Sequence, residues 1–129
     1  MARPRKQGID LIYLDLNLLT HHWMKRMRME FKNDAVTFYI VVLREIYHSP
    51  HIQIVLTDKR DQQILADEVG VTLEKFMEMV QVSVKLGVFD EKLYIDEMIL
   101  TSEFFKKDAD YILKNREESR KKYDTLAKK

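Results

Sequence analysis

The chain has 129 residues and no cysteine. Without cysteine it can form no disulfide bond, no thiolate zinc site and no cysteine nucleophile. Its basic N-terminus is not followed by an apolar run that would suit a signal peptide. We therefore expect an intracellular, cytoplasmic protein.

Long apolar runs are also missing. The longest, residues 35–43, is interrupted by Thr37 and is far shorter than the roughly 20 residues of a membrane-spanning helix, so we expect no membrane association. Only 3 glycines and 2 prolines leave little material for long flexible loops, while 46% hydrophobic residues are enough to fill a core. Length and composition together predict one globular domain of ordinary size.

An excess of one charge is missing as well, because 22 Lys and Arg oppose 21 Asp and Glu for a formal net charge of +1. The charges are nevertheless segregated along the chain. Residues 1–6 hold three cations, residues 7–105 hold 10 basic and 16 acidic side chains, and residues 106–129 hold 9 basic and 5 acidic ones. Affinity for a polyanion depends on local cation density, so the two basic ends are candidate contacts for nucleic acid. They are equally compatible with solvated tails.

The first part of the chain predicts an N-terminal arm over residues 1–16 and then two helices. Thr20 is expected to cap a short amphipathic helix with a basic outer face, and Asp34 to cap an apolar helix over residues 35–48. Pro50 must end this second helix, because proline lacks the amide hydrogen. The next six residues, as far as Leu56, are expected to form a short strand or an extended arm.

The middle of the chain predicts a helix-turn-helix. Asp58 can cap one helix, which ends at Gly70, a residue that adopts the left-handed conformation at little cost. Thr72 can cap a second helix over residues 73–86, and Gly87 ends it. Two helices joined by so short a connection are typical of the helix-turn-helix motif.

A β-hairpin is expected directly after this motif. Its strands are predicted at residues 88–89 and 99–101, with a turn and an irregular connection between them, and Ser102 can cap a final helix. Helix-turn-helix followed by a hairpin is the order of a winged helix. We therefore predict a mainly α fold of the α+β class: a winged helix-turn-helix over residues 17–101 with an N-terminal arm, a small β-wing and a basic C-terminal helix or tail over residues 102–129.

Several short segments of the chain resemble a known family. They are residues 1–10 and 14–15 near the start, followed by 43–47 (LREIY), 86–90 (LGVFD) and 99–102 (ILTS). In this order and spacing they resemble a listerial-type domain at the N-terminus of phage-associated replication proteins, which is similar to the N-terminal winged helix of the DnaD replication-initiation proteins. The resemblance implies a winged-helix fold and a non-enzymatic role in phage-type DNA replication, together with other replication proteins.

The second helix of a helix-turn-helix is the usual DNA reader, and here its sides differ. At about 100° per residue, one apolar stripe is expected in the core and comprises Leu73, Phe76, Met77, Val80 and Val84. The opposite side begins with two acids, Glu74 and Glu78, in the turns that normally contact DNA. We therefore expect DNA contacts to come mostly from the periphery of the domain.

Two hypotheses for function follow from these patterns. In the first, the chain is a DNA-binding winged helix that contacts duplex DNA, mainly without sequence preference, through Arg3, Arg5, Lys6, Lys25, Arg26, Arg28, Lys75, Lys85 and Lys92. In the second, it is a protein-interaction or self-association module without direct DNA binding. Such a module would form a homo-oligomer by burying a second, outer stripe of Met79, Val82 and Leu86. The same stripe is also compatible with packing under the chain's own C-terminal helix.

Sequence patterns for catalysis are missing. His21 and His22 point about 100° apart on a helix, and His48 and His51 lack the His-Glu-x-x-His pattern of zinc enzymes. The three glycines are isolated, so the chain has no glycine-rich loop to hold a phosphate. We therefore expect no enzyme activity, no metal site and no cofactor.

Overall fold

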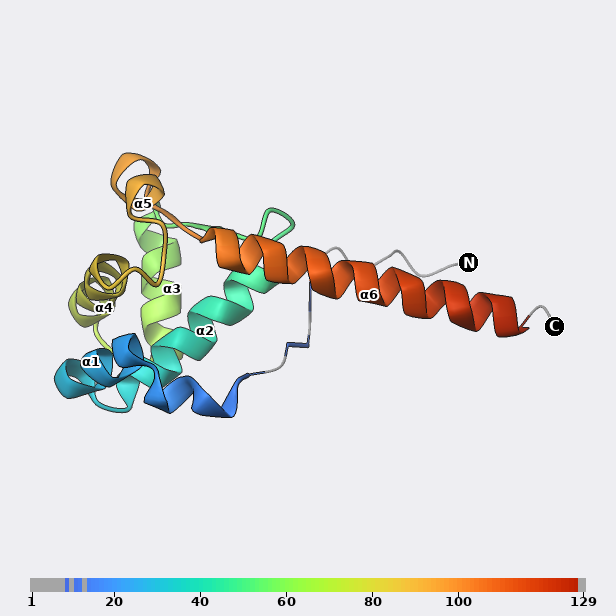
Figure 1. Ribbon diagram of the computed structural model, residues 1–129. Coiled ribbons are helices and arrows are strands. Elements are labelled where there is room, and N and C mark those ends of the chain that lie inside the picture. Colours follow the sequence, from blue (N-terminus) through green and yellow to red (C-terminus); the bar gives the residue numbers. More distant parts are fainter. Residues whose placement is uncertain (1–8, 10, 13, 128–129) are drawn as a thin grey trace.

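The computed structural model describes residues 9, 11–12 and 14–127 of the chain (Figure 1). Within them the fold is mainly helical, with a small two-stranded antiparallel sheet, as the α+β prediction requires. Its elements in chain order are the 3-10 helix η1 (Leu16–Thr20), α1 (His22–Phe31), α2 (Asp34–His48), β1 (Ile54–Val55), α3 (Lys59–Val69), α4 (Leu73–Lys85), α5 (Glu91–Glu97), β2 (Ile99–Leu100) and α6 (Glu103–Ala127).

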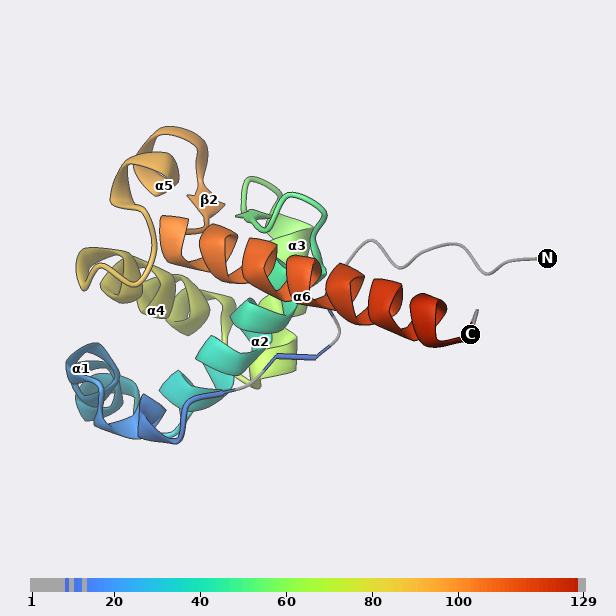
Figure 2. The same cartoon turned by 45° about the vertical axis from the view of Figure 1, so that its right-hand side comes forward.

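Helix α2 forms the centre of the core, as its nearly continuous apolar sequence predicts. It contacts α1, α3, α4 and β1, and seven of its side chains are buried (Figure 2). Phe38 packs edge-on against Phe76 of α4, with ring centroids 5.5 Å apart. Full burial of such side chains contributes about 1.5–3 kcal/mol each, so α2 is the element around which the others assemble.

The two helices predicted in the middle of the chain are confirmed as α3 and α4. The carboxylate of Asp58 accepts a hydrogen bond from the Arg60 backbone at 2.8 Å and starts α3, and Gly70 ends it with φ +86°. The hydroxyl of Thr72 accepts from the Lys75 backbone at 3.1 Å and starts α4. These caps satisfy backbone groups that a helix end leaves free, which explains why the boundaries could be predicted from local sequence.

The starts of α1 and α2 differ from the prediction. Thr20 belongs to η1, where its hydroxyl donates to the Asn17 carbonyl at 2.7 Å, so His21 precedes α1 without a side-chain cap. Asp34 is already in the first turn of α2, because the tight turn at Lys32 and Asn33 starts that helix one residue earlier. Its carboxylate is therefore free to pair with another helix.

The predicted hairpin is wrong in its first strand and its connection. Val88 and Phe89 form no strand, and helix α5 replaces the irregular connection because the Asp90 carboxylate accepts from the Leu93 backbone at 3.0 Å and caps a new helix. The strand predicted at residues 99–101 is confirmed as β2. Its partner is β1, which lies before the helix-turn-helix, with Ile54 opposite Leu100.

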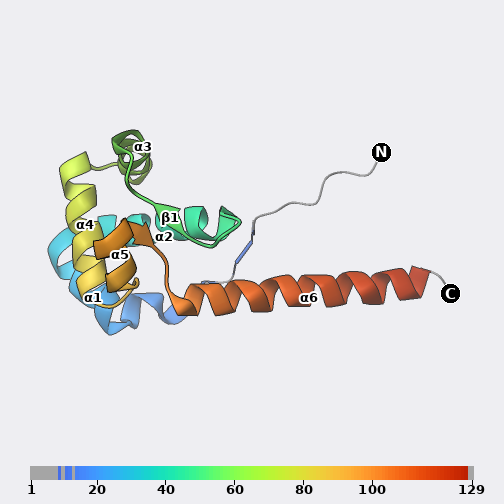
Figure 3. The same cartoon turned by 90° about the horizontal axis from the view of Figure 1, so that it is seen from above.

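Helix α6 begins on the body and then projects away from it (Figure 3). Ser102 caps it as predicted, because its hydroxyl accepts from the Phe105 backbone at 3.3 Å. Phe105 and Ala109 are buried, Ile112 is partly buried, and none of the described side chains beyond Ile112 is buried. The helix has 25 residues and is therefore about 37 Å long, of which only the first turns are held by the body.

Candidate nucleic-acid interface

The outward face of α4 is narrow and acidic. Its exposed side chains are Glu74, Glu78, Gln81 and Lys85, whose spacing of four, three and four residues places them on one stripe. Two carboxylates thus oppose one ammonium group on the helix that would be the DNA reader of a helix-turn-helix. A phosphate backbone lying along this stripe would be repelled.

The outer apolar stripe predicted on α4 does not exist as an exposed surface. Met79 is 0% exposed, and Val82 and Leu86 are partly buried and pack against the core. The reason is that α4 has buried neighbours on two sides, since it contacts α1 as well as α2 and α3. Met79 is therefore a core residue, and the three side chains form no free surface for a partner.

The three predicted cations on α4 and beyond it have different surroundings. The ammonium group of Lys75 lies 2.7 Å from the Asp34 carboxylate, so its charge is already paired. Lys85 is exposed at the end of α4. Lys92 is also exposed; it lies in the first turn of α5, where Glu91 precedes it.

Helix α1 carries a basic face. Lys25 and Arg26 are exposed, Lys32 follows the helix and is exposed, and Arg28 is half-buried. The Arg28 guanidinium donates from Nη2 to the Asn33 side chain at 3.4 Å, while its buried Nε has no hydrogen-bond partner. The helix contains one acid, Glu30. We call Lys25, Arg26, Arg28 and Lys32 the α1 basic face; the predicted Arg3, Arg5 and Lys6 lie outside the described residues.

The contrast with the rest of the body is large. Residues 22–32 contain four basic side chains and one acidic one, whereas residues 58–97, from the cap of α3 to the end of α5, contain five basic and ten acidic ones. The predicted cations therefore lie in segments of opposite net charge. Those of α1 share one short stretch of chain, whereas Lys85 and Lys92 lie on the acidic segment, at the end of α4 and at the start of α5.

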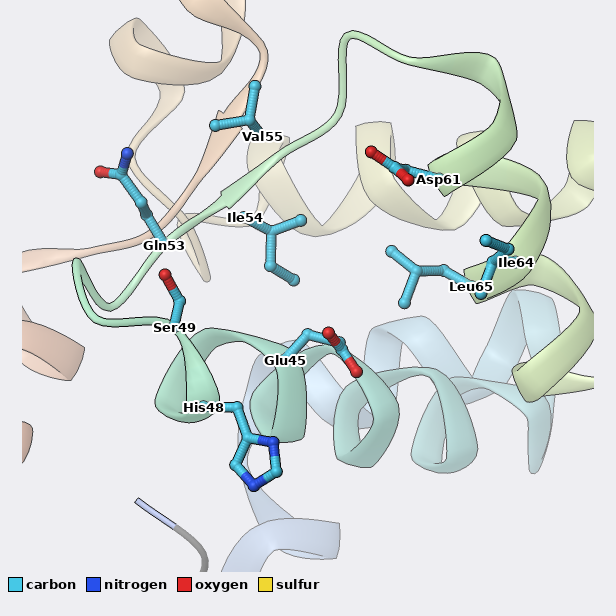
Figure 4. Close-up of a pocket in the computed structure, with 9 residues that line it drawn as sticks. All are labelled: Glu45, His48, Ser49, Gln53, Ile54, Val55, Asp61, Ile64 and Leu65. Carbon is cyan, nitrogen blue, oxygen red and sulfur yellow. The ribbon is translucent and has the colours of Figure 1, made fainter. Parts of the chain in front are cut away.

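A hollow between the end of α2, β1 and α3 contains polar groups but no convergent site (Figure 4). Glu45 and Asp61 line it, and the His48 ring points to the other side of α2 from Asp61. Across the described residues, no group of three or more His, Asp or Glu side chains is placed to hold a metal ion. None of the described helices is both long and apolar enough to cross a membrane.

A second hollow, which we call the aromatic groove, lies between the η1–α1 segment and the start of α6. Its lining includes Asp15, Trp23, Tyr39, Tyr47, Phe104 and Asp108. The Trp23 and Tyr39 rings are 4.8 Å apart, and the Tyr47 hydroxyl donates to Asp108 Oδ2 at 2.7 Å. Among the described residues that line the groove, none is Lys or Arg.

The tyrosines of the aromatic groove are held in their neutral form. Burial, and then the nearby Asp108 carboxylate, raise the pKa of Tyr39 to about 12. Burial and the hydrogen bond to Asp108 also raise the pKa of Tyr47. Sequence reasoning missed this groove, because Tyr47 and Asp108 are 61 residues apart and no local pattern links them.

The class of protein is thus a mainly helical domain with a small two-stranded antiparallel sheet. A family model described as Lin1244/Lin1753-like, N-terminal, matches residues 12–105, and the chain belongs to this family. The listerial-type family named from the sequence is therefore confirmed. Comparisons with curated proteins and with solved structures found no match. The match ends at Phe105, so most of α6 lies beyond it.

Proposed function

We propose that the chain is a non-enzymatic DNA-binding domain of the winged-helix type, similar to the N-terminal domain of DnaD, and that it acts in phage-type DNA replication. Helix α2, strand β1, helices α3 and α4 and strand β2 follow one another in the order of a winged helix. The antiparallel pairing of β1 with β2 across the helix-turn-helix supports this assignment. Helix α5 stands where the tip of a wing would be.

The observation that carries the proposal is the α1 basic face. Exposed Lys and Arg side chains on one surface bind phosphates through charge and release counterions, and this requires no base contact. The acidic stripe of α4 disfavours insertion of that helix into the major groove. DNA is therefore expected to lie along α1 and to be bound with little sequence preference.

A salt titration with paired variants tests this proposal. Duplex DNA of mixed sequence is titrated with the full chain at several salt concentrations, and binding is followed by fluorescence anisotropy. In Lys25→Glu/Arg26→Glu the slope of log affinity against log salt should fall by about 2, because each phosphate-contacting cation contributes about 1. The matched control is Lys59→Glu/Arg60→Glu, which makes the same charge change on the exposed start of α3 and should lower affinity much less.

Two outcomes contradict the proposal. One is no binding of the unmodified chain to DNA at low salt, where counterion release favours complexes most. The other is an equal loss of affinity in both double variants, since that would mean that only the total charge matters. Urea unfolding of all three proteins checks that the substitutions leave the fold intact.

The alternative function is a protein-interaction module without direct DNA binding. It is favoured by a specific observation: six exposed large hydrophobic side chains lie on the two segments that flank the aromatic groove. They are Leu11, Leu14, Leu16, Leu19, Phe104 and Tyr111. Apolar side chains grouped around a hollow are typical of a contact with another protein. The same duplex titration separates the two functions, because this module would show no salt-dependent DNA binding.

A further inference from the structure

Helix α6 has a continuous face that is largely exposed. At about 100° per residue, seven side chains lie within about 40° of Asn115 on the helix surface; they are Phe104, Asp108, Tyr111, Asn115, Ser119, Lys122 and Leu126. Three of them are apolar and largely exposed: Phe104 at 70%, Tyr111 at 66% and Leu126 at 71%. We call this set the α6 outer face.

The two ends of the α6 outer face differ in chemistry. At the root of the helix, Phe104 and Asp108 belong to the aromatic groove, which also contains the carboxylate of Asp15. Residues 114–127 at the far end contain five basic and three acidic side chains, and Lys122 and Leu126 lie on the outer face. An acidic, aromatic root and a basic, apolar far end are complementary. Helix α6 is one continuous helix, so its far end cannot reach its own root.

We propose that a second copy of the chain occupies the aromatic groove, with the two α6 helices packed antiparallel about a two-fold axis at Asn115. This proposal goes beyond the DNA-binding function and does not depend on it. In this arrangement a residue that lies a given number of positions before Asn115 faces the partner residue that lies the same number of positions after Asn115. Phe104 then meets the partner's Leu126, and Asp108 meets the partner's Lys122.

The length of the helix fits this arrangement. Asn115 is 11 residues from both Phe104 and Leu126, which is about 16 Å along the axis in each direction. The far end of one helix therefore lies above the groove of the other copy. The contact is isologous, so one mode of packing covers both grooves and both far ends and leaves no free surface for further growth.

The pairing of Asp108 with the partner's Lys122 supports the same alignment of the two helices. The Asp108 carboxylate already accepts a hydrogen bond from Tyr47, and an ionised carboxylate retains lone pairs for further donors. The partner's Lys122 would supply such a donor with a charge of opposite sign. Shifting the two helices by one turn would place Lys122 opposite a residue other than Asp108 and would separate Phe104 from Leu126.

Cysteine cross-linking tests the arrangement directly, because the natural chain has no cysteine. In Phe104→Cys/Leu126→Cys the two thiols are 22 residues apart on one helix, about 33 Å, so a disulfide can form only between copies. Asn115→Cys, at the axis, should form a covalent dimer by itself. Ile95→Cys is the matched control, since Ile95 is 67% exposed on α5 and does not belong to the α6 outer face. Mild oxidation and a non-reducing gel give the dimer fractions.

Sedimentation equilibrium provides the second measurement. The unmodified chain should form a dimer, and Leu126→Glu should give a monomer. Lys122→Asp alone should weaken the dimer. The double variant Lys122→Asp/Asp108→Lys, which exchanges the two charges, should restore it. A chain that stays monomeric at about 100 μM, where a dimer with a micromolar Kd is largely formed, would overturn the proposal. Two other results would place the contact elsewhere and overturn the proposal. One is a dimer that persists in Leu126→Glu, and the other is cross-linking of the α6 cysteine variants no better than that of the Ile95→Cys control.

Discussion

Helices α1 and α4 pack against one another, yet their exposed faces carry opposite charges. Lys25 and Arg26 are exposed on α1, whereas Glu74 and Glu78 are exposed on α4. The second helix of a helix-turn-helix is the usual DNA reader, but here the charge favours its neighbour. In the proposed function, the distribution of charge, and not the position of a helix in its motif, therefore decides which surface faces the DNA.

The two helices also differ in how much of their surface is buried. Five residues of α4 are buried, against three of α1. Helix α4 is enclosed by α1, α2 and α3, so only one narrow stripe of it reaches solvent. Helix α1 lies at the edge of the body, where its outer face is free. Helix α4 therefore contributes mainly to the stability of the fold, and α1 offers the free surface that the proposed DNA binding requires.

The largest expected effect tests the inner side of α4. Met79→Ala should lower the free energy of unfolding by about 2–5 kcal/mol, because it removes a fully buried side chain and leaves a cavity. Gln81→Ala, on the exposed stripe of the same helix, should change it by less than about 0.5 kcal/mol. Urea unfolding measures both. Equal and small losses would break the assignment of α4 to the core.

Local signals explain what the sequence could predict. Asp58, Gly70 and Thr72 define the ends of α3 and α4 through contacts within a few residues, and those boundaries are confirmed. The apolar sequence of α2 likewise predicts its central position. The basic face of α1 could be found because three cations recur within this short helix and a fourth, Lys32, directly follows it.

Contacts between distant segments explain what the sequence could not predict. Pairing of β2 with β1 joins residues more than 40 positions apart, so a local hairpin was expected in its place. Met79 is predicted on the outer side of its helix, because the helical wheel was assigned a single buried side. In the structure α4 is covered on two sides, and Met79 lies on the second one. Asp90 is a local capping signal that could have indicated α5, but a turn was expected directly after the strand predicted at residues 88–89.

The second prediction reverses the two exposed negative charges that distinguish α4 from α1. Glu74→Lys/Glu78→Lys should raise affinity for duplex DNA at low salt about tenfold, or about 1.4 kcal/mol, because α4 lies beside the α1 basic face. Glu91→Lys/Glu97→Lys makes the same change on the exposed surface of α5 and should raise it less. Fluorescence anisotropy measures both. Equal gains would show that total charge, and not its position beside α1, controls binding.

The smallest expected effect concerns Lys32, where α1 ends. Its backbone has φ +55° and ψ −136°, a conformation that costs a residue with a side chain about 1–3 kcal/mol and costs glycine little. Lys32→Gly removes this strain, but glycine also adds conformational freedom to the unfolded chain. This freedom offsets about 0.4–1 kcal/mol of the free energy gained from the relieved strain. We therefore expect a net gain in the free energy of unfolding of about 1 kcal/mol.

Lys32→Ala separates the strain from the charge. It removes the same ammonium group and keeps the Cβ atom, so it should not stabilise the fold, whereas both variants should weaken DNA binding to the same extent. Urea unfolding and the salt titration measure the two effects on the same proteins. A stability gain in Lys32→Gly together with unchanged DNA affinity would remove Lys32 from the α1 basic face and confine that face to the helix itself. A loss of affinity in both variants would mean that the chain keeps a strained lysine at the end of α1 because its charge contributes to binding.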